Sequence, residues 1–123
     1  MLKNDKAGQA FARWLGEAVA RVRTLEEKGS SLLGDDDAYR AVMLEKALLV
    51  AGLHEESAPF LKDLEEKDRA YPEDRLRAFS ESAALGLRLG SVFYMSALLF
   101  PEDHQAGEPN ELEALAAELS LEL

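Results

Sequence analysis

Apolar residues recur every three or four positions along most of the chain, which is the spacing of one face of an α-helix. The first stripe predicts a helix over residues 4–28 and consists of Ala7, Phe11, Trp14, Ala18, Val22 and Leu25. Asn4 or Asp5 is suited to cap the start of this helix, and Gly29 is suited to end it. Residues 29–37 combine glycine, serine and three aspartates, which is typical of a loop that leads into a helix.

Two more stripes predict helices over residues 38–51 and 56–70. Gly52 is expected to follow the end of the first, and Pro59 to lie in the opening turn of the second. The pair Tyr71-Pro72 marks the next boundary, because a residue that precedes proline avoids helical dihedral angles.

A fourth helix is predicted from Pro72 to Phe100, where Pro101 stops it. Its second half, residues 83–100, is apolar on nearly every side, which is typical of a helix buried in a bundle. A last short helix is predicted after Asn110, which forms a cap-box pattern with Glu113. Its apolar face consists of Leu112, Leu115 and Leu119.

Composition agrees with this pattern. Of 123 residues, 22 are Leu and 19 are Ala, while Val and Thr together supply only six and Ile is absent. The chain is therefore predicted to be all-α, an antiparallel bundle of four to five helices with a long buried fourth helix. Residues 1–100 form the bundle domain, and residues 101–123 form an acidic C-terminal segment whose short helix packs on the same domain.

An internal repeat gives an alternative for the fourth helix. Gly52, Ser57, Leu61 and Leu64 reappear 34 positions later as Gly86, Ser91, Met95 and Leu98. This offset resembles the tetratricopeptide repeat period, and the resemblance implies a break in the fourth helix near residues 86–90.

The net charge of −10 is unevenly distributed. Residues 101–123 contain seven acidic residues and neither Lys nor Arg, so the rest of the chain is close to balanced. Such acidity argues against general affinity for nucleic acid, yet the first helix has a basic side. The residues on it that are expected to contact phosphates in a nucleoprotein complex are Lys6, Arg13, Arg21, Arg23 and Lys28.

No group of residues matches a known catalytic, cofactor or metal site. Cysteine is absent, which removes disulfides, thiol nucleophiles and thiolate ligands. His54 and His104 lack the Glu-x-x-His spacing of di-iron bundles, and both are expected on the surface. The run Asp35-Asp36-Asp37 lacks the spaced ligands of a calcium loop and is interpreted as a helix cap.

A ridge of small residues in the fourth helix has the spacing that allows close helix packing. It consists of Ala78, Ser82, Gly86 and Gly90. Because glycine destabilises a helix interior, two glycines on this ridge indicate a packing reason. Either another helix of the same chain or a partner in a homodimer approaches the ridge.

These features favour a non-enzymatic interaction protein, a small acidic adaptor, chaperone or regulator that binds another protein. The first alternative is a helical subunit of a nucleoprotein complex, and the second is an enzyme of unrecognised type. The amino terminus lacks the pattern of a signal peptide, and the apolar stretch at 83–100 contains Arg88, Gly and Ser. A cytoplasmic location without a membrane span is therefore expected.

Overall fold

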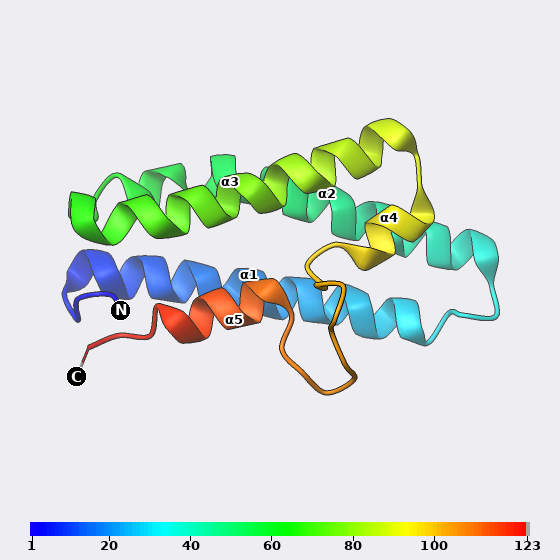
Figure 1. The fold of residues 1–123 in the computed structure, drawn as a ribbon, viewed down its shortest axis with the longest axis horizontal. Helices are drawn as coiled ribbons and strands as arrows, with labels where there is room; N and C mark the ends of the chain where they lie inside the picture. Colours follow the sequence, from blue (N-terminus) through cyan, green and yellow to red (C-terminus); the bar gives the residue numbers. More distant parts are fainter. Residues whose placement is uncertain (123) are drawn as a thin grey trace.

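The computed structural model describes residues 1–122. In this range the helices are α1 (Lys6–Ser30), α2 (Asp36–Leu61), α3 (Glu66–Leu89), α4 (Val92–Ala97) and α5 (Glu111–Glu118) (Figure 1). The only β-pairing among these residues is an isolated bridge between Leu2 and Leu121. The prediction of an all-α helical bundle is confirmed.

Helix α2 is the central element of the bundle. It packs lengthwise against α1 on one side and α3 on the other. The short α4 lies against α2 and α3, and α5 lies along α1 (Figure 1). Both ends of the chain therefore meet at one end of the bundle, where the backbone of Leu2 pairs with Leu121.

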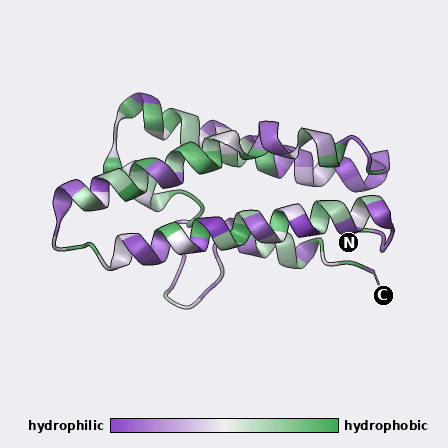
Figure 2. Ribbon diagram, turned by 180° about the vertical axis from the view of Figure 1, so that it is seen from behind, coloured by the Kyte–Doolittle hydropathy of each residue, from purple (hydrophilic) through white to green (hydrophobic). Residues whose placement is uncertain are grey.

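A single apolar core joins all five helices. The fully buried side chains include Phe11 and Leu15 of α1, Leu53 of α2 and Leu76 of α3. Helix α5 contributes three more leucines, Leu112, Leu115 and Leu119. Each fully buried side chain of this size stabilises the fold by about 1.5–3 kcal/mol. Bands of apolar and polar residues follow each other along α1 and α2, as expected for helices with one buried face (Figure 2).

Polar side chains cap the first turns of α1, α2, α4 and α5. Asp5 accepts a hydrogen bond from the backbone N–H of Gly8 at 2.8 Å, and Asp35 accepts one from Ala38 at 3.1 Å. Ser91 caps α4 in the same way. Asn110 and Glu113 form the complete capping box of α5, with each side chain bound to the other residue's backbone N–H. These bonds satisfy N–H groups that have no partner within a helix.

The predicted break at Gly52 is wrong, because α2 continues to Leu61. The buried face of this helix runs without interruption through Val50, Leu53 and Ser57, all of them fully buried. Packing against two neighbouring helices outweighs the weak helical preference of one glycine. Pro59 lies in the last turn, where its missing N–H removes one hydrogen bond only.

The predicted boundary at Tyr71-Pro72 is also wrong. Helix α3 begins at Glu66 and passes through Pro72, which is itself buried. Leu76 and Phe79 follow on the same buried side. The core contact made by these residues holds the segment helical although proline disfavours it.

The helix predicted over residues 72–100 is divided at Gly90. This residue adopts a left-handed conformation with φ of 61°, which glycine allows without a Cβ clash. The chain then turns into the six-residue α4, so the fourth helix is short rather than long. The break falls at the position that the 34-residue offset implied. Within residues 1–122, no helix has both the length and the apolar character needed to cross a membrane.

Candidate functional site

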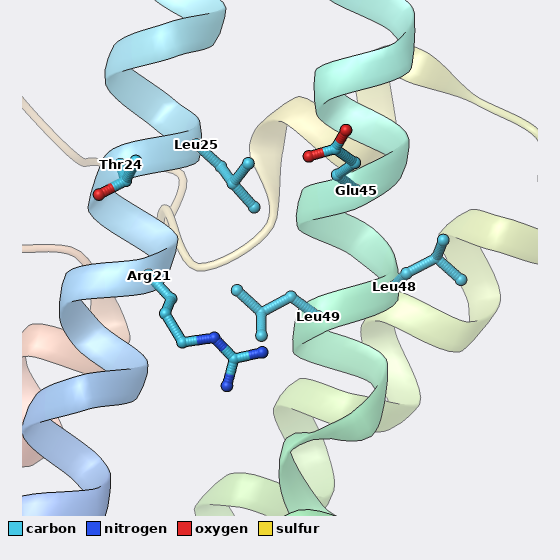
Figure 3. A pocket seen from close by; sticks show the side chains of 6 residues that line it. All are labelled: Arg21, Thr24, Leu25, Glu45, Leu48 and Leu49. Carbon is cyan, nitrogen blue, oxygen red and sulfur yellow. The ribbon is translucent and has the colours of Figure 1, made fainter.

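A groove with a volume of about 560 Å³ lies on the surface between α1 and α2. The close-up of this groove shows the residues that line it (Figure 3). From α1 they are Arg21, Thr24 and Leu25, and from α2 they are Glu45, Leu48 and Leu49. Leu25 and Leu49 point toward each other across the groove and form its apolar floor (Figure 3).

The rim of the groove on α2 exposes apolar side chains. Leu48 is 57% exposed and Leu44, one helical turn earlier on the same side, is 43% exposed. Leu44 lies beyond the groove and lines a smaller pocket of about 160 Å³ on the α3 side of the helix, together with Leu87 and Val92. Clustered exposed leucines beside a groove are typical of a surface that binds another protein.

The charged residues of the groove lie at its two ends. The guanidinium of Arg21 lies at one end and the carboxylate of Glu45 at the other, with the two leucines between them (Figure 3). Arg21 forms an ion pair of 3.1 Å with Glu56, and both side chains are about half exposed. An ion pair this exposed contributes little to stability, so Arg21 remains able to interact with a binding partner.

A second unusual feature is a buried ion pair in the interior. Nζ of Lys46 lies 3.5 Å from Oε2 of Glu26 and donates a hydrogen bond of 3.1 Å to the backbone oxygen of Ser96. The ammonium also lies 4.8 Å from the ring centre of Phe100. Oε1 of Glu26 accepts a hydrogen bond of 3.2 Å from the side chain of Asn110. One polar network thus joins α1, α2 and the C-terminal segment.

Burial shifts the pKa of both charged groups toward their neutral forms. Desolvation raises the pKa of Glu26 above its ordinary value, although Lys46 and Asn110 act in the opposite direction. Desolvation lowers the pKa of Lys46, against the attraction of Glu26. Oε2 of Glu26 also has no hydrogen-bond partner among the described residues. The attraction between Glu26 and Lys46 therefore offsets the desolvation cost of the two charges only in part.

The Lys46–Glu26 pair is a buried structural contact. A pocket of about 140 Å³ adjoins it, yet the Lys46 side chain is only 1% exposed. Catalytic groups with shifted pKa values lie in clefts where a substrate can reach them. The pair therefore holds α1, α2 and the C-terminal segment in register.

The five basic residues predicted to contact phosphates have different surroundings. Arg21 pairs with Glu56, and Arg23 pairs with Glu113 of α5. Among the described residues, the remaining three form no ion pair, and they are Lys6, Arg13 and Lys28. The acidic C-terminal segment therefore neutralises one member of the predicted basic face.

The ridge of small residues is partly occupied by the chain itself. A Cβ atom on Gly86 would lie 2.8 Å from the Tyr94 ring of α4, so glycine permits close packing there. Ala78 and Ser82 are both exposed, while Gly90 forms the cap at the end of α3. Whether Ser82 and Ala78 also contact a partner stays a prediction.

The other polar features form no metal site. Among residues 1–122, no three His, Asp or Glu side chains are grouped as ligands. The backbone N–H of His54 donates to Ser80, and the His104 ring lies against Phe100. Of the three consecutive aspartates, Asp35 caps α2, and Asp36 and Asp37 occupy its first turn.

Comparison of the chain with family models, curated proteins and solved structures finds no match. The interpretation of the groove therefore depends on its geometry and chemistry alone.

Proposed function

We propose that this chain is a non-enzymatic interaction protein and that the α1–α2 groove is the surface that binds another protein chain. The observation that carries the proposal is the exposure of Leu44 and Leu48 beside an apolar groove of about 560 Å³. Water contact with such side chains is unfavourable, and a partner that covers them gains about 25 cal/mol for each Å² of apolar surface buried.

The shape of the groove favours a helix as the bound element. Two antiparallel helices with a leucine floor accept an amphipathic helix that presents apolar residues at positions i and i+4. Arg21 and Glu45 at the two ends would fix the direction of that helix through charge complementarity.

An enzymatic role has less support from the same residues. The buried pair of Lys46 and Glu26 gives a substrate little access, because the Lys46 side chain is only 1% exposed. Phosphate binding through α1 also has less support, because Glu113 of α5 pairs with Arg23 and so reduces the positive charge of this face.

The test is a pull-down from the native source with three tagged chains: wild type, Leu48→Glu and Leu89→Glu. Leu89 lies at the end of α3 and is 62% exposed, so it is a matched control for Leu48 at 57%. We expect wild type and Leu89→Glu to retain a stoichiometric protein after nuclease treatment, and Leu48→Glu to lose it. Retention by all three chains would exclude the groove, and loss after nuclease would favour the nucleoprotein alternative.

A further inference from the structure

The outer face of α2 presents a row of exposed leucines beside the groove. Leu44 and Leu48 project from it as a ridge, four residues apart, and the groove with Leu25 and Leu49 lies directly beside them. A row of leucines at this spacing can pack against the same row on a second, antiparallel copy of the helix. A twofold symmetric interface requires one surface that fits itself, and this surface meets the requirement.

The two ends of the groove carry opposite charges, so they also complement those of a second copy that runs in the reverse direction. A twofold axis that crosses both helices at the level of Leu25 and Leu49 reverses the direction of the groove in a second copy. Arg21 of each copy then lies at the same end of the interface as Glu45 of the other. A parallel arrangement would instead bring the two Arg21 side chains together at one end and the two Glu45 side chains at the other.

Gly52 gives an independent reason for a close neighbour on this face. It lies within α2, where glycine is less favourable than alanine, and a Cβ atom built on it would meet nothing within 4 Å. No contact within the chain therefore requires glycine. Gly52 and Leu44 are each four residues from Leu48, so the same reversal brings Leu44 of one copy toward Gly52 of the other.

Resting on the proposed function, we infer that the chain that covers the groove and the exposed leucines is a second copy of this protein, in an antiparallel twofold dimer. The contact buries the exposed leucines of both copies. It also forms two equivalent Arg21–Glu45 pairs between the copies.

The test is the mass in solution, measured by light scattering over a range of concentrations, for four chains. These are the wild type, Arg21→Glu, Glu45→Arg and the double variant with both changes. We expect the wild type to reach twice the 13.6 kDa of the chain. Each single variant places like charges together and should weaken the dimer by about tenfold, and the double variant should restore it.

The double variant separates the dimer contact from effects within one chain. Both Arg21→Glu chains lose the internal pair with Glu56, so recovery of the dimer in the double variant cannot come from that pair. Circular dichroism verifies that all chains fold, and Leu89→Glu should dimerise as the wild type does.

A wild-type chain that stays at 13.6 kDa at millimolar concentration would overturn the dimer. The same holds if the double variant associates no better than the single variants. If the pull-down still shows a different protein whose binding depends on Leu48, the proposed function stands and only the second copy is excluded.

Discussion

Nζ of Lys46 lies 3.5 Å from Oε2 of Glu26 in the interior, where α1 and α2 meet the C-terminal segment. The two residues are on different helices, and Asn110 joins the same carboxyl group from the start of α5. The acidic end of the chain is thus fixed to the bundle by a buried charge as well as by its leucines.

Removing one partner of this pair should destabilise the fold strongly. Lys46→Met leaves the carboxylate of Glu26 without its counter-charge in a mostly buried position, and we expect a loss of about 3 kcal/mol in the free energy of unfolding. The double variant Glu26→Gln, Lys46→Met should recover most of this loss, because neither charge is then buried. Urea denaturation measures both values, and a single variant as stable as the wild type would contradict the role of the pair.

The raised pKa of Glu26 predicts a specific dependence on pH. Because the folded protein holds this proton more tightly than the unfolded chain, the shift favours folding most at pH values below the ordinary pKa of 4.5. That contribution is lost as the pH rises from there through the folded-state pKa. The unfolding free energy of the wild type minus that of Glu26→Gln should therefore decrease as the pH rises over this range. A constant difference would show that burial does not shift the group.

Gly86 should tolerate no long side chain. A Cβ atom at this position already lies 2.8 Å from the Tyr94 ring, so Gly86→Leu must displace α4. We expect a loss of roughly 1–3 kcal/mol, seen as a lower melting temperature. Gly16 is the matched control, since a Cβ atom there meets nothing within 4 Å. If Gly86→Leu melts at the wild-type temperature, α4 does not pack against this ridge.

Gly52→Ala should change stability and association in opposite directions. Alanine is favoured over glycine within a helix by about 1 kcal/mol, so the isolated chain becomes more stable to urea. The added methyl group lies on the face that we assign to the second copy, and the dimer should weaken. Unfolding of dilute protein and light scattering of concentrated protein measure the two effects. Unchanged association would remove Gly52 from the interface.

The sequence predicted the parts of the fold that local spacing determines. The stripe from Phe11 to Leu25 and the capping box at Asn110 correspond to α1 and α5. The helix boundaries predicted at Gly52 and Pro72 were wrong, because core contacts on both sides of these residues hold the backbone helical. Local preferences at these two positions are weaker than the packing of the residues around them.

The groove was not predicted because the leucines at its exposed rim lie off the apolar stripe. Leu44 and Leu48 are on the outer side of α2, and a single outward leucine is common in any helix. Only the pairing of α1 with α2 shows that Leu48 borders Leu25 and Leu49. The buried lysine did have a local signal, since Lys46 lies four residues from both Val42 and Val50 on the buried stripe.

The most direct test of the central claim is photo-crosslinking from the groove. The chain has no cysteine, so Leu48→Cys provides a single site for a benzophenone label, and Leu89→Cys provides the control. With intact cells or their extract, the label at position 48 should form a discrete crosslink to a protein chain, with a second copy of this protein as the expected product. The label at position 89 should form none. If the two positions give the same products, or position 48 gives none, the groove does not bind a protein.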